Sequence, residues 1–241
     1  METKKIPTCV DGLDDVLGGG IPAGHVVLVS GLPGTMKSTL TFAILHGNAR
    51  DHGAKALYVS LEQTRKSLEA QMAAMGFDLD ATRGDVHILD VGSIQKELGR
   101  SATKPWMEFL RRTLETKKEI DGIDLVVLDS LEALEVLAKF EDRRSDLFAF
   151  FEWLRDLGAT TLVLAEAAAD LPFLGADPTH GRKDEAYLAD GIVELKMHQI
   201  SDVDVQRRLR VVKMRGSNHL TGFHALVFED GRFQITRVIS L

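Results

Sequence analysis

Short apolar segments alternate along this chain with longer segments in which apolar residues recur at helical spacing. The apolar segments predict strands at His25–Ser30, Ala54–Ser60, Val86–Val91, Leu125–Asp129 and Thr160–Ala165. The segments of helical spacing predict helices at Ser38–Arg50, about Thr64–Met75, Pro105–Ile120 and Asp146–Leu157. Strands that are apolar on both faces and separated by helices are typical of a parallel sheet covered on both sides. We therefore predict an α/β core with a mostly parallel sheet flanked by helices.

From Gly191 onward, apolar segments follow one another without helical segments between them. They predict strands at Ile192–Met197, Leu209–Met214, His224–Glu229 and Phe233–Ile235. Glu229-Asp230-Gly231-Arg232 is a hairpin signal. We therefore expect C-terminal antiparallel strands appended to the parallel core. Leu171–Ala186, which is rich in proline, glycine and charge, predicts a loop, and residues 1–241 are expected to form a single domain.

The composition is typical of a globular protein with a sizeable core, at 241 residues with 44% hydrophobic and 27% charged side chains. A formal net charge of −7 argues against broad, charge-driven binding to nucleic acid. Cys9 is the only cysteine, which excludes an intrachain disulfide. No apolar run approaches the roughly 18–20 residues of a membrane-spanning helix, and the N-terminus lacks the apolar core of a signal peptide. We therefore expect a cytoplasmic protein.

The segment Gly31–Ser38 lies between the first predicted strand and the helix that follows it. It matches the phosphate-loop pattern G-x-x-x-x-G-K-[ST] at every fixed position except the second glycine, which is Met36. The glycines that are present permit a tight turn that points N–H groups at a phosphate. Lys37 would reach the β- and γ-phosphates, and the Ser38 hydroxyl would ligate magnesium, while the helix adds its positive N-terminal dipole. The alternative is a turn that merely joins strand to helix.

Two acidic residues could complete such a site. Leu125–Asp129 is an apolar strand ending in a carboxylate, an arrangement that orients magnesium through water. Glu62 follows the second predicted strand and could activate the attacking water as general base. Its alternative role is that of an exposed glutamate favoured by a helix dipole. The residues predicted to hold nucleotide or magnesium from within the chain are Gly31, Pro33, Gly34, Thr35, Met36, Lys37, Ser38, Thr39 and Asp129.

With these residues, the chain resembles the KaiC-like branch of the RecA superfamily. Three segments carry the resemblance: Gly12–Gly24 before the phosphate loop, the loop itself with Glu62 and Asp129, and Val212–His219, which is similar to a late K-M-R-G-S-x-H signature. The resemblance implies a RecA-like P-loop NTPase core that binds ATP and Mg²⁺. It also implies a homo-oligomeric ring, commonly a hexamer, with ATP clamped between neighbouring subunits.

The resemblance further implies that residues of the late signature project toward the phosphates bound by the next subunit. These residues are Lys213, Arg215, Ser217 and His219. Residues two apart on a strand share a face, so the four could line one surface if the strand continues. Cations there would stabilise charge on the transferring phosphoryl group. The alternative is a solvated polar edge strand.

The chain departs from the family pattern in ways that predict slow turnover. The Met36 side chain would approach the bound phosphates, and Gln63 stands where the family often has a second glutamate after Glu62. Ala186-Tyr187 occupies the approximate register of the Ser-Thr pair that the circadian clock protein phosphorylates in itself. We therefore expect no autokinase activity of the clock type.

Two further segments have open interpretations. The aromatic segment Asp146–Leu154 is either ordinary core or a helix packed against a neighbouring subunit. The basic cluster Arg207–Arg210 either contacts phosphate, of nucleotide or of single-stranded nucleic acid, or protects a strand edge. The leading hypothesis is an ATPase of slow turnover with Lys37 on the phosphates and Glu62 as base. The alternatives are a nucleotide-gated regulator or scaffold, and a recombination accessory protein acting on single-stranded DNA.

Overall fold

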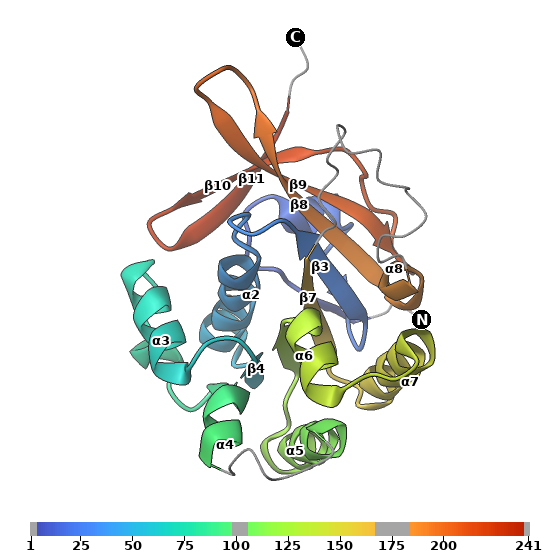
Figure 1. Cartoon of the computed structure of the whole chain (residues 1–241). Coiled ribbons are helices and arrows are strands. Elements are labelled where there is room, and N and C mark those ends of the chain that lie inside the picture. The colour runs from blue at the N-terminus through green and yellow to red at the C-terminus, as the bar shows by residue number, and fades with distance from the viewer. Residues whose placement is uncertain (1–3, 98–105, 167–183, 239–241) are drawn as a thin grey trace.

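The computed structural model describes residues 4–97, 106–166 and 184–238. Its centre is a nine-stranded sheet of order β11-β10-β9-β8-β3-β7-β6-β4-β5 (Figure 1). The strands are β3 (Val26–Gly31), β4 (Ala56–Ser60), β5 (Val86–Asp90), β6 (Leu125–Asp129), β7 (Thr160–Glu166), β8 (Gly191–Gln199), β9 (Val205–Met214), β10 (His224–Glu229) and β11 (Arg232–Arg237). Strands β3 to β8 pair in parallel, and β8 to β11 pair in antiparallel fashion. The predicted parallel core with its antiparallel extension is confirmed.

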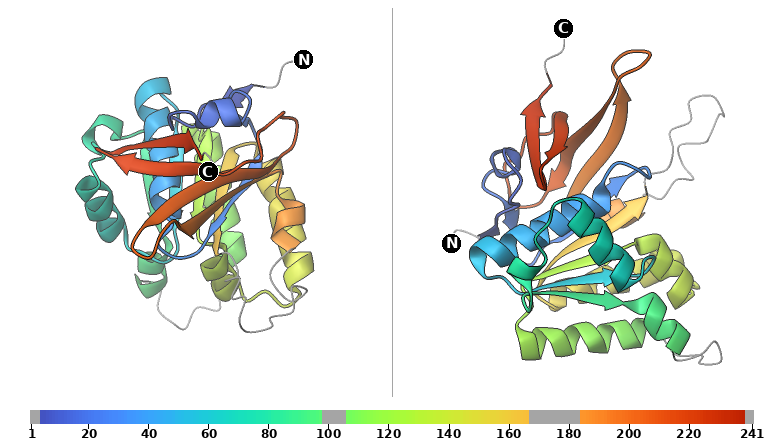
Figure 2. Two further views of the ribbon diagram at one scale, coloured as in Figure 1. Left: turned by 90° about the horizontal axis from the view of Figure 1, so that it is seen from above. Right: turned by 90° about the vertical axis from the view of Figure 1, so that its left-hand side faces the viewer.

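Helices cover both faces of the parallel part of the sheet, because successive strand residues point to opposite faces and are apolar on both. Val27 and Val29 of β3 face one core with α2 and α3, whereas Val26 and Leu28 face a second core with α5, α6 and α7. The helices are α2 (Lys37–His52), α3 (Arg65–Ala74), α4 (Val91–Glu97), α5 (Trp106–Asp121), α6 (Leu131–Ala138), α7 (Arg143–Asp156) and α8 (Asp184–Leu188). Figure 2 shows α2 and α3 above the sheet and α5 below it in the right-hand view, with the β8–β9 hairpin and β10–β11 projecting beyond the helices.

Several short elements lie outside the predicted pattern. They are β1 (Lys5–Ile6), α1 (Leu13–Val16), β2 (Ile21–Pro22) and the 3₁₀ turn η1 (Asp80–Thr82), together with α4, α6 and α8. The predicted loop Leu171–Ala186 falls outside the described residues as far as residue 183. Residues 184–186 belong to α8 (Asp184–Leu188), so the loop prediction is wrong there. The aromatic helix α7 buries Phe150 and Phe151 completely in the second core, which favours the core interpretation for these two residues, whereas Phe148 is 50% exposed.

Residues 7–9, which precede α1, pack directly on α2 at a glycine. A Cβ on Gly47 would lie 2.4 Å from the Cβ of Cys9 and 2.9 Å from its Sγ. Asn48, the next residue of α2, donates from Nδ2 to the Pro7 carbonyl oxygen over 2.7 Å. Burial raises the pKa of the Cys9 thiol to about 11, so the thiol stays protonated at neutral pH. The segment is therefore fixed to α2 by close contact and a hydrogen bond.

We expect Gly47→Ala to lower the free energy of unfolding by about 1–2 kcal/mol, measured by urea denaturation. Alanine gains about 1 kcal/mol over glycine inside a helix, but the overlap with Cys9 costs more. Cys9→Gly should recover most of the loss in the Gly47→Ala background, because it removes the Cβ and Sγ that overlap the new methyl group. Glycine also adopts the φ of 56° at this position readily. A Gly47→Ala protein as stable as the wild type would contradict this packing.

Candidate nucleotide-binding site

The loop between β3 and α2 holds the predicted phosphate-binding residues, and its two glycines serve different purposes. Gly34 has a φ of +82°, the left-handed conformation that suits glycine. Gly31 has no such φ, but a Cβ there would lie 2.6 Å from the Leu195 carbonyl oxygen and 2.8 Å from the Thr35 hydroxyl oxygen. The sequence suggested that both glycines permit the turn. Gly31 is instead required by the close approach of β8 and of the loop itself.

Met36 stands in the place of the second glycine of the pattern and adopts a conformation that suits glycine. Its φ of 72° and ψ of 30° are left-handed, which costs a residue with a Cβ roughly 1–2 kcal/mol. Its side chain is half-buried and packs against the core that α2 and α3 share with the sheet. The loop therefore keeps its glycine-like backbone while it carries an apolar side chain.

A cavity of about 450 Å³ opens beside this loop, at the carboxyl ends of the parallel strands. Its lining residues are Pro33, Gly34, Met36, Lys37, Ser38, Thr39, Glu62, Gln71, Met75, Asp129, Ser130, Glu166 and Arg207. Most residues predicted to bind nucleotide or magnesium from within the chain are therefore brought together. Gly31 and Thr35 do not line the cavity. Thr35 is buried, and its hydroxyl donates to the Leu32 carbonyl oxygen over 2.8 Å.

Lys37 holds a positive charge at the edge of this cavity. Its Nζ donates to the carbonyl oxygen of Gly31 over 2.7 Å and to that of Leu32 over 3.2 Å. Burial lowers the pKa of Lys37, and nearby carboxylates, first Glu166 and then Asp129, oppose this effect. An anion in the cavity would offset the cost of burying the ammonium group, which is the property expected of a phosphate ligand.

Tyr58 contributes a contact that the sequence analysis missed. It is fully buried in β4, and its hydroxyl donates a hydrogen bond to Oδ2 of Asp129. Burial raises the pKa of Asp129, and hydrogen bonds with Tyr58 and Ser38 offset part of this rise. A cation would remove the remaining cost of burying this carboxylate, and magnesium prefers such oxygen ligands. The positions of Ser38 and Asp129 therefore fit the predicted magnesium ion.

Glu62 lies in the turn between β4 and α3 and is exposed in the cavity wall. It precedes the helix, whose N-cap is Thr64, with a side-chain oxygen that accepts from the Ser67 amide. The hydroxyl of Ser130 donates a hydrogen bond to Oε1 of Glu62. Glu62 is thus held by a hydrogen bond from the residue that follows Asp129.

Glu166 and Arg207 also line the cavity. Glu166 was not predicted from the sequence, whereas contact with nucleotide phosphate was one of the open interpretations for the cluster that contains Arg207. Glu166 ends β7 and is the register partner of Gly31. It could have been found by the reasoning that selected Asp129, since it also follows an apolar parallel strand. Arg207, from the basic cluster, donates from Nε to the Gly34 carbonyl oxygen over 3.4 Å. This arginine therefore lies against the phosphate loop of its own chain.

The late Lys213–His219 segment does not continue β9. The strand ends at Met214, and the chain turns at Arg215 and Gly216, where glycine has a φ of +69°. The expectation that the four residues of the signature line one strand face is therefore wrong. A glycine inside the signature allows a reversal that a period-two pattern does not include.

The second half of the Lys213–His219 segment packs on Lys5 of β1 and on Leu17, which follows α1. The Ser217 hydroxyl donates to the Leu17 carbonyl oxygen and lies 3.4 Å from Lys5 Nζ. His219 Nδ1 lies 3.3 Å from the Ser217 carbonyl oxygen. Its Nε2 is buried and has no hydrogen-bond partner within the described part of the chain. Ser217 is thus held inside the chain, whereas His219 keeps one ring nitrogen unpaired there.

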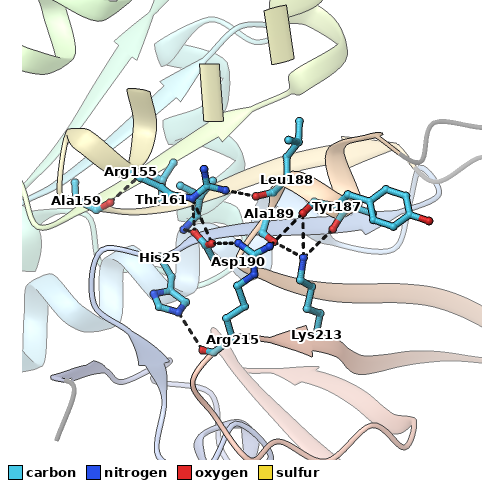
Figure 3. Close-up of polar contacts among 12 residues, drawn as sticks. His25, Arg155, Ala159, Thr161, Tyr187, Leu188, Ala189, Asp190, Lys213 and Arg215 are labelled. Carbon is cyan, nitrogen blue, oxygen red and sulfur yellow. Dashed lines mark hydrogen bonds and ion pairs between the residues drawn. The ribbon is translucent and has the colours of Figure 1, made fainter. Parts of the chain in front are cut away.

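Lys213 and Arg215 lie together against α8 and the start of β8 (Figure 3). The Lys213 ammonium donates to the carbonyl oxygens of Ala186, Tyr187 and Ala189 over 3.2, 3.2 and 2.7 Å. Arg215 Nη1 donates to Oδ1 of Asp190 over 2.8 Å. Both cations therefore have hydrogen-bond acceptors in their own chain.

These cations lie at the amino end of β3, opposite the phosphate loop. His25 Nε2 lies 3.0 Å from the Arg215 carbonyl oxygen, and the Val26 amide donates to Oδ2 of Asp190 over 3.1 Å. From Val26 to Gly31 the strand rises about 16 Å at roughly 3.3 Å per residue. Within one chain, Arg215 is therefore separated from the cavity by the length of a strand.

Comparison with known proteins agrees with this geometry. A family model described as "ATPase: KaiC" matches residues 6–238. The chain belongs to the KaiC family. A UPF0273 protein of Thermotoga maritima is 28% identical over 238 residues, which cover 94% of this chain and 93% of that protein. The circadian clock protein KaiC2 of Synechocystis is 25% identical over 240 residues, or 98% of this chain and 41% of that protein.

The fold has a close counterpart among solved structures. A KaiC-like protein from Pyrococcus horikoshii matches with a TM-score of 0.79 at 21% identity, covering 98% of this chain and 100% of that chain. The fold is thus RecA-like, and membership of the KaiC family supports nucleotide binding. Among the described helices, none combines the length and the apolar character needed to cross a membrane.

We expect Tyr58→Phe to weaken the affinity of the nucleotide-bound protein for Mg²⁺ by about tenfold, the lower end of the effect of removing a group that orients a metal ligand. Phenylalanine fills the same space but no longer fixes the Asp129 carboxylate. Isothermal titration of Mg²⁺ into the protein with a non-hydrolysable ATP analogue measures the effect. Tyr187→Phe is the matched control, because Tyr187 is 74% exposed on α8. Equal Mg²⁺ affinities in both variants would contradict the assigned role of the phenol.

Proposed function

We propose that this chain is an ATPase that assembles as a homo-oligomeric ring, binds ATP at subunit interfaces and hydrolyses it slowly. One observation carries the proposal. The cavity holds Lys37, Glu62 and Asp129, whereas Lys213 and Arg215 lie at the other end of β3. A cavity without those cations becomes a full site when a neighbouring subunit supplies them. Family membership supports this reading, since the ring is what the KaiC resemblance implies.

In the proposed reaction, each residue of the cavity has a separate task. Lys37 exchanges its loop carbonyl partners for the β- and γ-phosphate oxygens, and the loop amides bind the same phosphates. Ser38 and Asp129 would hold Mg²⁺, which would supply positive charge to offset that of the phosphates. Glu62 accepts a proton from the water that attacks the γ-phosphorus, and the bond to the ADP oxygen breaks. The neighbour's Arg215 and Lys213 then offset the negative charge on the transferring group.

Three features support slow turnover. Met36 carries a side chain into the wall of the cavity where the pattern has glycine. Gln63 provides no second carboxylate beside Glu62. Ser130 donates a hydrogen bond to Oε1 of Glu62, so one of the two oxygens that could take a proton from water is already engaged. These features also favour a second candidate function, a nucleotide-gated regulator or scaffold with little turnover.

The role of a recombination accessory protein on single-stranded DNA has less support. Arg207 of the basic cluster contacts the phosphate loop, and Arg210 pairs with Glu194 over 2.6 Å. The net charge of −7 opposes a polyanionic partner. A salt-dependent gel shift with single-stranded DNA would restore this alternative.

We expect Glu62→Gln to lower phosphate release about 100-fold or more, because a positioned general base contributes roughly 10²–10⁴-fold. Glutamine keeps the shape but cannot accept the proton. Magnesium-ATP binding, measured by calorimetry, should remain. Gln63→Ala is the control on the same turn and should keep the wild-type rate. Equal phosphate release in wild type and Glu62→Gln would instead establish the regulator or scaffold function.

Mixed assemblies test the shared interface. Lys37→Ala should abolish magnesium-ATP binding in its own cavity, whereas Arg215→Ala should leave that binding intact and lose phosphate release. A mixture of the two variants, allowed to exchange subunits, should recover activity, because an intact cavity then meets an intact Arg215. Lys66→Ala, an exposed lysine on α3, is the control for Lys37→Ala. No recovery in the mixture would exclude a site completed by the neighbour.

A further inference from the structure

We propose that Asp190 is a positioning residue, which orients the Arg215 guanidinium toward the ATP bound by the neighbouring subunit. This inference rests on the proposed function, since it assumes that Arg215 acts across the interface. Asp190 itself is buried at the start of β8 and touches no part of the cavity in its own chain. Its effect on the reaction therefore passes through Arg215.

The carboxylate of Asp190 is fixed before it meets Arg215. Its Oδ2 accepts from the Val26 amide over 3.1 Å, which ties it to the first residue of β3. Arg155 of α7 donates from Nε to both carboxylate oxygens over 3.2 and 3.3 Å. Because the carboxylate is held by a central strand and a packed helix, its position does not depend on the exposed Arg215 side chain. The position of the carboxylate therefore determines the orientation of the arginine.

Arg215 is held along one edge and open along the other. Nη1 donates to Asp190 over 2.8 Å, whereas Nη2 makes a longer contact of 3.5 Å with the Tyr187 carbonyl oxygen. The side chain is 53% exposed. A guanidinium presents its donors in a rigid, planar fork, so fixing one edge fixes the direction of the remaining donors. The open edge is then available to phosphate oxygens from another chain.

The charge on Asp190 persists at neutral pH. Burial acts to raise its pKa, but the Val26 amide, Arg155 and Arg215 outweigh this, so that the pKa lies below its usual value. The ion pair with Arg215 is therefore present at neutral pH. Lys213, in contrast, already donates to several carbonyl oxygens around the end of α8. Of the two cations, Arg215 is the one that a buried carboxylate orients while leaving donors available to a ligand.

A purely structural role for Asp190 would have a different signature. Arg155 and Arg215 both pair with this carboxylate, and Arg155 is the more buried of the two, with 30% of its side chain exposed against 53%. Removing Arg155 should therefore cost at least as much stability as removing the pair with Arg215. It leaves the contact between Asp190 and Arg215 in place. Arg155→Met is thus a matched control for Asp190→Asn.

We expect Asp190→Asn to lower phosphate release about 10–100-fold, the usual effect of misplacing a catalytic group by about 1 Å. ATP binding in the unaltered cavity, measured by calorimetry, should not change. Arg155→Met should lower the rate less than Asp190→Asn does, because the Val26 amide still holds the carboxylate and the contact with Arg215 remains. The rates are compared at a temperature where both variants are folded by circular dichroism. Mixing Asp190→Asn with Lys37→Ala should recover phosphate release, because the lost function segregates with Arg215 and not with the cavity.

Asp190→Glu keeps the charge but moves the carboxylate by one methylene, so it tests the proposal even if Asp190→Asn fails to fold. We expect a reduced rate with unchanged ATP affinity. A wild-type rate in Asp190→Glu, or an equal loss in Arg155→Met and Asp190→Asn, would overturn the proposal. If Arg215→Ala recovers with Lys37→Ala but folded Asp190→Asn does not, the shared interface stands and the role of Asp190 falls. If neither mixture recovers, the proposed function itself fails.

Discussion

A strand that pairs in parallel on both sides must be buried on both faces, and β3 is such a strand. It pairs with β7 as far as Gly31↔Glu166 and with β8 as far as Gly31↔Leu195. Parallel pairing places the carboxyl ends of these strands at one edge, where the phosphate loop leaves the sheet. The same register brings the Leu195 backbone so close to Gly31 that no side chain fits there. The position of the cavity, at this edge of the sheet, therefore follows from strand pairing before any polar residue is considered.

The two ends of β3 also determine how copies of the chain can cooperate. One end carries the cavity, and the other carries Asp190, Lys213 and Arg215. Two such surfaces are different, so a two-fold dimer that matches each surface with itself cannot bring them together. Head-to-tail contacts can, and they close into a ring when the rotation permits. The separation of charges within one chain thus favours the assembly that the proposed function requires.

The sequence was most informative where one local pattern decides the structure. Leu125–Asp129 has the predicted bounds because an apolar run buried on both faces has few alternatives. Lys37 and Ser38 follow from spacing alone. Tyr58 could not be found in this way, because a tyrosine in a buried strand resembles any core residue until β4 and β6 are paired. The prediction for residues 215–219 was wrong because a strand pattern does not continue across Gly216, where the chain turns.

Met36 shows which positions of a phosphate loop are open to evolutionary change. At Gly31 the Cβ of any other residue would overlap the Leu195 backbone, so a side chain is excluded there by lack of space. At Met36 the barrier is only conformational, roughly 1–2 kcal/mol for a left-handed residue. The half-buried thioether chain returns a comparable amount through its contacts with the core. The fold can therefore carry an apolar residue at this position of the loop with little net cost in stability.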